Sequence, residues 1–444
     1  MTIIIQRFFI TAVLLLGAVS VQAANHYIRA GAAGSANGND WTNAYTALPA
    51  TLIRGDVYYV AGGSYAGMTL NTPASGSLLI TIIGATVADH GSDVGWNSGY
   101  GVENAQVTWT SGFIINTSYW IFDGSVGPTL SKTPAQYGFK FNSMQYPMAI
   151  YNTSTAISDI TISHIAATAP TGDVERFFVE TDNATKSVNN VTISHNYGSG
   201  WSNFIWATSA GLAMNSWVVE YNVVLDGYSS AANHGENINN NFSNMTGLTV
   251  RYNWFEGRTS GTACIVVLNG DAGDYYIYGN VFKDMEFGDG CITGVINGYG
   301  TQEMSGVVYN NTFINVQSPY SYGGWIGTAV LSTVSNNLLY NMMADMRSNP
   351  PHDYNAYFAT TNTPAETNRQ TGTGNPFKNL AAGDLTLLAA TNAGTSLPAP
   401  YNVDAFGKVR GADGVWDRGA FEFTSGSGPA PNPPPAAPKG LRTP

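Results

Sequence analysis

The chain has 444 residues, of which 18 are basic and 29 acidic, so its formal net charge at pH 7 is −11. An acidic chain is not expected to bind nucleic acid, whose phosphates it would repel. Charged residues make up only 11 % of the chain, and 50 residues are glycine. This composition disfavours long exposed helices, which usually carry more Lys and Glu, and predicts strands and turns.

The first segment, residues 1–23, has the features of a secretory signal peptide. Arg7 precedes an apolar run from Phe8 to Val19, and Val-Gln-Ala ends at Ala23, the expected cleavage site. Cleavage leaves 17 basic and 29 acidic residues, a net charge of −12. No later apolar stretch reaches the ~20 residues of a membrane-spanning helix. We therefore expect a secreted protein, located outside the cell, on its surface or in the periplasm.

Residues 24–423 are predicted to form one repeat domain. Six segments share an asparagine, in the phrases SHNYGSG, EYNVVLDG, RYNWFEG, YGNVFKDM, YNNTFINV and SNNLLYN. The intervals between the shared residues are 26, 31, 27, 31 and 26, and the residues are Asn196, Asn222, Asn253, Asn280, Asn311 and Asn337. A repeat this short cannot bury a core of its own, so successive repeats must stack into a solenoid.

Apolar residues occupy fixed positions around each asparagine. The residue three before it is Val219, Val250, Ile277, Val308 or Val334, and the residue two after it is Val224, Phe255, Phe282, Phe313 or Leu339. The runs end at Gly, Asn, Asp or Ser, which predicts short strands and tight corners without crossover helices. The asparagine suits a corner at which its amide satisfies the backbone of adjacent coils.

With these repeats, the chain resembles the right-handed parallel β-helix proteins of the pectate-lyase-like superfamily, over roughly residues 25–423. The resemblance implies an all-β, single-stranded, right-handed parallel solenoid with coils of about 26–31 residues. Residues 424–444 read TSGSGPAPNPPPAAPKGLRTP, a Gly/Ser/Pro-rich composition that predicts an extended linker or tail.

Cys264 and Cys291 stand 27 residues apart in matching phrases, GTACIVVLNG and GDGCITGVING. Adjacent coils lie about 4.8 Å apart, which is within the Cα range of a disulfide. The two residues are expected to be vertical neighbours, either bridged or as two thiols side by side.

The predicted catalytic centre is the segment Asn-His-Gly-Glu-Asn at 233–237. His234 and Glu236 are two residues apart, so on a strand their side chains face the same side. Such a pair can serve as a general base with its orienting partner, or can bind a divalent cation. The alternative is a hydrogen-bonded pair at a coil corner. Trp206 is expected within one coil of Glu236 and is a candidate platform for stacking a sugar.

Three basic residues are further candidates. Arg251 and Lys283 could bind the carboxylate of a uronate substrate, but they occupy the positions of Glu220 and Glu256 one coil earlier. Cross-coil ion pairs are therefore the alternative interpretation. Arg258 has no matching acid and is the third candidate, as a catalytic residue.

An acidic patch is the candidate metal site. Asp271 and Asp274, with Glu286 and Asp289 one coil on, offer the hard oxygen ligands that calcium prefers. Calcium is the cofactor that this patch predicts, although Asp-Gly pairs are also ordinary turn residues.

Two further residues share a register. His164 and His195 both end the phrase TISH, and Tyr221 and Tyr252 follow in the same position. This pattern predicts a ladder of stacked rings.

The leading hypothesis is a secreted, monomeric, carbohydrate-active enzyme that cleaves a polysaccharide or surface glycan. A lyase is favoured over a glycoside hydrolase, which needs a second carboxylate about 5 to 9.5 Å from Glu236. The alternative is a non-catalytic carbohydrate-binding or adhesive surface protein. The chain lacks the Arg-x-Pro-x-x-Arg phrase of pectate lyases and the paired motifs of polygalacturonases, which favours that alternative.

Overall fold

The computed structural model describes residues 23–424, except 153, 173–174, 182–183, 209–212, 228–234, 242–243, 259–262, 269–273, 287–293, 300–304, 318–323, 328–331 and 347. The predicted signal peptide and the predicted tail therefore lie almost entirely outside the described residues. Within the described part, no helix is long and apolar enough to cross a membrane.

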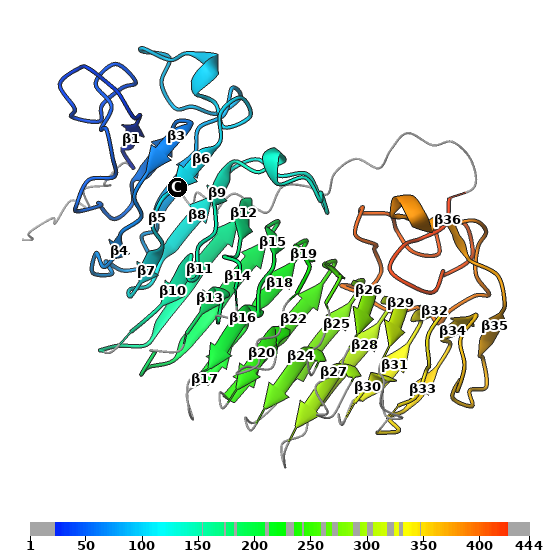
Figure 1. Ribbon diagram of the computed structural model, residues 1–444. Coiled ribbons are helices and arrows are strands. Elements are labelled where there is room, and N and C mark those ends of the chain that lie inside the picture. Colours follow the sequence, from blue (N-terminus) through cyan, green and yellow to red (C-terminus); the bar gives the residue numbers. More distant parts are fainter. Residues whose placement is uncertain are drawn as a thin grey trace, which may run out of the picture.

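Three long parallel sheets wind around a common core (Figure 1). Sheet A consists of β1 Asn25–Ile28, β2 Val57–Val60, β5 Ile80–Gly84, β8 Trp120–Asp123, β11 Ile157–Ser163, β14 Val188–Ser194, β18 Val218–Glu220, β22 Leu248–Arg251, β25 Asp274–Tyr278, β28 Ser305–Tyr309, β31 Thr333–Ser335 and β33 His352–Asp353. Sheet B consists of β3 Gly63–Tyr65, β6 Val107–Trp109, β9 Phe139–Phe141, β12 Ile165–Thr168, β15 Tyr197–Ser199, β19 Val223–Leu225, β23 Trp254–Glu256, β26 Val281–Glu286, β29 Thr312–Gln317, β32 Leu338–Tyr340, β34 Ala356–Phe358 and β35 Gln370–Gly372.

Sheet C consists of β4 Thr69–Leu70, β7 Phe113–Ile115, β10 Met148–Ile150, β13 Phe177–Glu180, β16 Asn203–Thr208, β20 Glu236–Asn241, β24 Ala263–Leu268, β27 Gly294–Tyr299 and β30 Gly324–Ile326. Two short pairs are added, β17 Ala213–Asn215 with β21 Asn244–Thr246, and β36 Phe377–Asn379 with β37 Asp384–Leu387. The described helical turns are the 3-10 segments η1 Ser98–Tyr100, η2 Pro134–Gln136 and η3 Leu380–Ala382.

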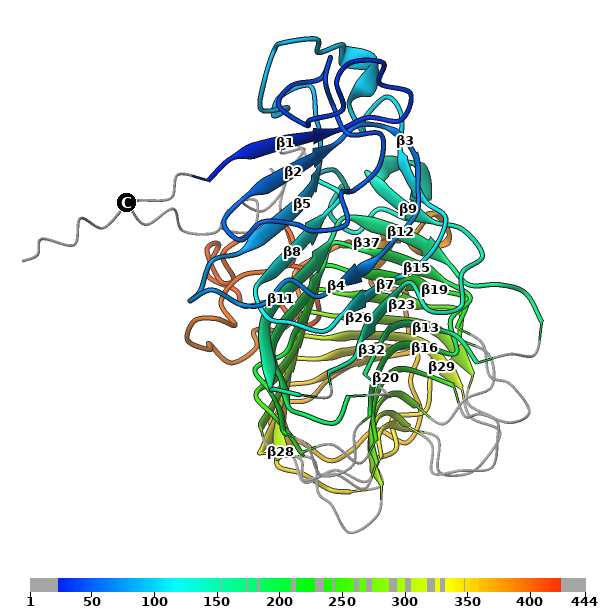
Figure 2. The ribbon, with the colours of Figure 1, turned by 90° about the vertical axis from the view of Figure 1, so that its left-hand side faces the viewer.

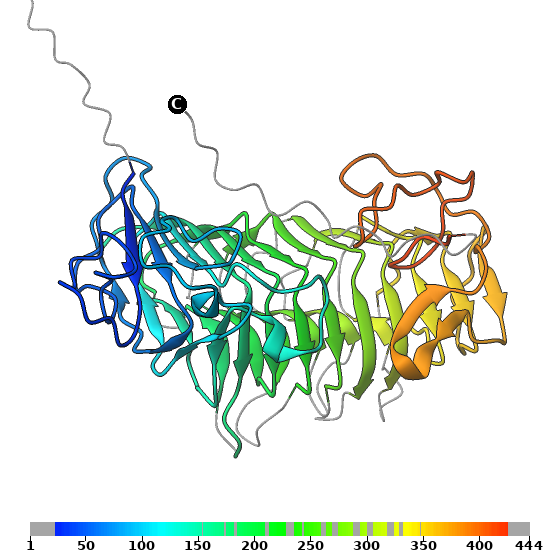
Figure 3. The same cartoon turned by 90° about the horizontal axis from the view of Figure 1, so that it is seen from above.

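From β2 to β32 the coils run from sheet A to sheet B to sheet C, and Figure 2 looks along the resulting stack. Figure 3 shows the elongated shape, with the first strands at one end and the C-terminal segment at the other. The prediction of an all-β, right-handed parallel β-helix is confirmed, because strands pair with their counterparts one coil away.

The predicted asparagine ladder forms the corner between sheets A and B. The backbone N–H and Nδ2 of Asn222 both donate to Oδ1 of Asn253, at 3.0 and 2.9 Å, and the pattern repeats from coil to coil. The ladder reaches one residue further than the repeat predicted, to Asn355, whose backbone N–H and Nδ2 donate to the carboxylate of Glu366. The buried amides thus satisfy backbone groups that a tight corner would otherwise leave unpaired.

The predicted apolar ladders form the core. Phe255, Phe282 and Phe313 are 0 % exposed, and their rings stack at centroid distances of 5.5 and 4.9 Å. The residues before the ladder asparagines have left-handed backbone, with φ of 54°, 55° and 57° at His195, Tyr221 and Tyr252. The predicted ladder of rings is present: the centroids of successive rings are 5.0, 4.7 and 5.1 Å apart along His164, His195, Tyr221 and Tyr252.

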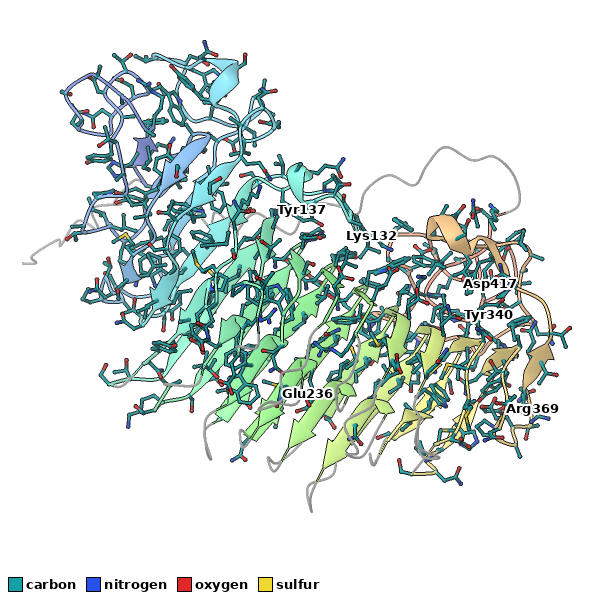
Figure 4. The ribbon with its side chains drawn as sticks, in the orientation of Figure 1. Lys132, Tyr137, Glu236, Tyr340, Arg369 and Asp417 are labelled. Atoms are coloured by element: carbon teal, nitrogen blue, oxygen red, sulfur yellow. The ribbon has the colours of Figure 1, made fainter. Side chains whose placement is uncertain are left out.

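Two excursions from the coils cover the outer side of sheet B. The first is the arm, defined as residues 125–137, in which the Tyr137 ring packs on the Tyr197 ring. Lys132 of the arm forms an ion pair with Glu256, and its Nζ lies 4.1 Å from the centroid of the Trp254 ring. The second is the C-terminal segment 388–424, in which Val403 accepts a hydrogen bond from the Tyr252 hydroxyl at 3.3 Å. Figure 4 labels Tyr137 and Lys132 on the arm and Asp417 on the C-terminal segment.

Candidate functional site

Of the segment predicted as the catalytic centre, Glu236 and Asn237 lie in sheet C. Glu236 begins β20, pairs with Asn203 of β16 and is 0 % exposed, as Figure 4 helps to locate. Its Oε2 accepts a hydrogen bond from Asn239 Nδ2 at 2.8 Å. The carboxylate of Glu236 is therefore buried in the structure. His234 lies outside the described residues, so the catalytic pairing stays a prediction.

Arg258 lies in the interior rather than on an accessible face. Its side chain is 0 % exposed, and its Nε and Nη2 donate to Oδ1 of Asn237 at 2.8 and 2.6 Å. Nη2 also donates to the carbonyls of Trp201 and Ser202. Burial lowers the pKa of Arg258 to about 10. A buried guanidinium held by carbonyl oxygens does not fit the predicted role in contacting substrate.

Trp206 lies on the strand next to Glu236, as predicted, but three residues further along, opposite Asn239. Its ring is partly buried and stacks on Phe177 at a centroid distance of 4.9 Å and an interplanar angle of 4°. One face of the indole is thus already covered by Phe177. Its role as a sugar platform stays a prediction.

The two basic residues in register with acids form the cross-coil ion pairs that the sequence offered as the alternative. Arg251 Nε lies 2.6 Å from Glu220 Oε2, and Lys283 Nζ lies 2.8 Å from Glu256 Oε1. Lys283 also contacts Asp284. Each cation therefore has a carboxylate partner within the protein.

The predicted calcium patch is only partly described. Asp274 begins β25, is exposed and lies 3.5 Å from the Ser305 hydroxyl, whereas Asp271 lies outside the described residues. Within the described ranges, no group of three or more His, Cys, Asp or Glu side chains could hold a metal ion. Cys264 is buried, and Cys291 lies outside the described residues, so the predicted pairing also stays a prediction.

A groove that the sequence did not single out crosses the outer face of sheet A. It has a volume of about 690 Å³ and runs over β5, β8, β11, β14, β18 and β22. Five steps between strands at about 4.8 Å give it a length of about 24 Å, enough for several sugar units. Ile121, Thr161, Thr192 and Val218 form part of its floor, and Arg251 stands at one end.

An aspartate and a histidine meet in this groove. His164 follows the end of β11, where a left-handed φ of 55° turns the chain at the corner. Its Nδ1 lies 2.6 Å from Oδ1 of Asp123, which ends β8 one coil earlier. The two side chains are 20 % and 24 % exposed, so both remain accessible from the groove.

The ionised carboxylate of Asp123 decides which ring nitrogen of neutral His164 carries the proton. Burial alone would raise the pKa of Asp123, but hydrogen bonds from His164, Ser125 N–H and the Ser163 hydroxyl hold that pKa below its ordinary value. An ionised carboxylate only accepts, so in neutral His164 the proton sits on Nδ1 and the lone pair on Nε2. The pair therefore has the form of an oriented acid–base residue.

His195 supports the ring of His164 from the next coil. The two rings stack at 5.0 Å and 24°. Burial, with a smaller effect of His164, lowers the pKa of His195 to about 3, so that His195 stays neutral. His195 is thus an uncharged stacking partner for the ring of His164.

A second hollow borders the groove at His164. It has a volume of about 550 Å³, and His164 and His195 form part of its lining. The arm supplies its other wall through Val126, Pro128 and Ala135. His164 lines both the hollow and the groove.

The sequence pattern placed His164 and His195 in one ladder but did not include Asp123 in it. Asp123 pairs in register with Ser163, the residue before His164. The position of Asp123, one coil before the TISH phrase that contains Ser163 and His164, is the sequence signal that could have predicted this contact.

Comparison with known proteins finds no matching family model and no matching curated protein. Among solved structures, pectate lyase Pel9A shares 13% identity over 90% of this chain and 98% of that chain, with a TM-score of 0.40. The PL6 alginate lyase AlyGC shares 14% identity over 76% of this chain and 53% of that chain, with a TM-score of 0.35. A rhamnogalacturonan lyase shares 10% identity over 90% of this chain and 96% of that chain, with a TM-score of 0.28. What this chain has in common with these enzymes is the right-handed parallel β-helix fold.

Proposed function

We propose that the protein binds an extended polysaccharide in the sheet A groove and cleaves it as a lyase. His164 is the base, and Asp123 orients it. The observation that carries the proposal is the 2.6 Å contact between His164 Nδ1 and Asp123 Oδ1 inside a groove of about 690 Å³. Structures of similar fold include polysaccharide lyases, which is consistent with this reaction class.

The chemistry is a β-elimination. His164 Nε2 takes the proton from the sugar carbon next to the carboxyl group. The electron pair of that C–H bond forms a carbon–carbon double bond, and the glycosidic C–O bond to the neighbouring carbon breaks. The leaving oxygen takes a proton from the imidazolium, so His164 ends the cycle neutral.

The spacing of Asp123 and Glu220 in the groove does not suit a glycosidase that uses these two carboxylates. Asp123 and Glu220 lie in the same row of sheet A, three strand steps apart. Three steps of about 4.8 Å separate them by about 14 Å. A glycosidase needs its two carboxylates about 5 to 9.5 Å apart. A lyase needs one oriented base, which this groove has.

The test is an assay of purified protein on uronate-containing and neutral polysaccharides, with and without calcium. Unsaturated products are followed by ultraviolet absorbance, and new chain ends by a reducing-sugar assay. His164→Gln should abolish the absorbance signal, whereas His352→Gln, in β33 at the far end of sheet A, should keep it. Loss of activity in Glu236→Gln but not in His164→Gln would move the active site to sheet C.

The non-catalytic alternative has its own outcome. Retention of glycans on an affinity gel without any product would identify a carbohydrate-binding surface protein. Weaker retention of a Val218→Trp variant, which fills the groove floor, would place binding in the sheet A groove.

Secretion is also part of the proposal, and residues 1–23 support it. Expression of the full chain and of a chain without residues 1–23 tests it, because only the full chain should reach the medium or the cell surface. Full-length protein that keeps residues 1–23 and stays in the cytoplasm would contradict this part.

A further inference from the structure

We infer that the groove selects a uronate polymer whose carboxyl groups are esterified and therefore neutral. This inference rests on the proposed lyase function and names the substrate class of the same site. It follows from the charge of the groove, from the position of the one arginine in its described lining and from the hollow beside His164.

The groove carries net negative charge. Among the described residues that line it, the carboxylates are Asp89, Asp123, Asp159 and Glu220, and the one permanent cation is Arg251. Without counting His164, these groups leave three net negative charges. The partners of Asp159 do not offset its charge, because they are the neutral Ser158 hydroxyl at 2.5 Å and the amide of Asn190. An anionic chain in this groove would be repelled along much of its length.

Arg251 is badly placed to neutralise a substrate carboxylate at His164. It already holds Glu220, with its Nε 2.6 Å from Oε2. It also lies four strand steps from Asp123 in the same row of sheet A, about 19 Å away at about 4.8 Å a step. A carboxylate at the reacting sugar would therefore face Asp123 without a cation from the described lining.

An ester removes this difficulty. Proton loss beside a carboxylate builds a second negative charge on the same sugar, next to the ionised Asp123. Proton loss beside an ester builds only one negative charge, which the ester carbonyl delocalises. The C–H bond of the esterified sugar is therefore more acidic than that of the free carboxylate. A neutral imidazole then suffices as the base.

The hollow beside His164 offers room for the ester group. It holds about 550 Å³, and Val102, Val126, Pro128 and Ala135 give it an apolar wall. Because His164 borders both spaces, a sugar whose ring lies in the groove can direct its carboxyl substituent across His164 into the hollow. Apolar side chains there favour an alkyl ester over a charged carboxylate.

The experiment compares one uronate polymer in two forms, methyl-esterified and saponified, with the wild-type protein. The esterified form should be cleaved at least tenfold faster. Activity on the saponified form should rise with salt, because the Debye length falls to about 10 Å at 0.1 M and screens the groove. Equal or faster cleavage of the saponified form, with the signal still lost in His164→Gln, would overturn this inference and leave the lyase proposal standing. No cleavage of either form would overturn both.

Two variants sharpen the comparison. Asp159→Asn should raise the rate on the saponified polymer about two- to fivefold, the range expected for one exposed charge, whereas Asp413→Asn, in the C-terminal segment, should change nothing. Ala135→Trp fills the hollow from an exposed position on the arm, so it should slow cleavage of the esterified polymer without changing the melting temperature. An unchanged rate in Ala135→Trp would contradict the hollow as the ester site.

Discussion

The guanidinium of Arg258 lies inside the solenoid, with its Nη2 2.6 Å from Oδ1 of Asn237. Asn237 in turn donates from Nδ2 to Sγ of Cys264 at 3.4 Å, so the three side chains form a polar cluster within the core. The position that looked most like an unpaired catalytic arginine is therefore part of the internal scaffold.

Replacing this arginine should destabilise the protein. Arg258→Met leaves Asn237 Oδ1 and the carbonyls of Trp201 and Ser202 without their donor. We expect a loss of about 3 kcal/mol in the free energy of unfolding, measured by chemical denaturation. The control is Arg369→Met, an exposed arginine, which should change it by less than about 0.5 kcal/mol. A fully stable but inactive Arg258→Met would instead restore the predicted catalytic role.

Asp123 should act through His164. In Asp123→Asn the amide can donate to Nδ1, which favours the tautomer with the proton on Nε2, where the base needs its lone pair. We expect kcat to fall by about 100-fold or more and the pH–rate profile to change shape. Asp353→Asn is the matched control, because Asp353 occupies the same row of sheet A at its other end. An unchanged pH profile in Asp123→Asn would argue against the oriented pair.

The asparagine ladder should be a major source of stability. Asn253→Ala removes the acceptor of two bonds from Asn222 and the donor to the Val219 carbonyl, all in the buried corner. Unfolding free energy should drop by about 3 kcal/mol, since buried groups lose their partners. Asn104→Ala, at an exposed turn, should cost less than about 0.5 kcal/mol. Equal losses in the two variants would refute the ladder as a stabilising element.

The C-terminal segment should respond to pH through Glu422. Burial, only partly offset by hydrogen bonds and Arg410, raises the pKa of Glu422 to about 7. The unfolded carboxyl ionises near pH 4.5, so between about pH 4.5 and 7 the folded state holds the extra proton and stability falls as pH rises. The contribution is at most about 3 kcal/mol. Thermal unfolding of Glu422→Gln should show a weaker decline across this window than the wild type does; parallel curves would disprove the assignment.

The vertical order of the molecule could be predicted from the sequence. The spacing of the asparagines indicated the coils, and their register correctly paired Glu220 with Arg251 and Glu256 with Lys283. It also placed His164 beside His195. These relationships repeat from coil to coil, so a periodic pattern carries them.

The sequence period could not predict which way a side chain points or which residues bury it. Glu236 was predicted to be a catalytic residue, but its side chain is 0 % exposed. The arm brings Lys132 to Glu256, which lies 124 residues later in the chain, and no sequence repeat predicts this contact. Such contacts depend on loops whose course is set by packing and not by period.

The sequence alone thus determined the stacked coils, the asparagine corner, the core ladders and the neighbours above and below each residue, because a solenoid translates sequence period directly into spatial distance. Only the tertiary structure decided that Arg258 turns inward, that Asp123 meets His164, and that sheet A is hollowed beside the arm. The physical reason is that these features depend on backbone angles at single corners and on excursions that pack across several coils.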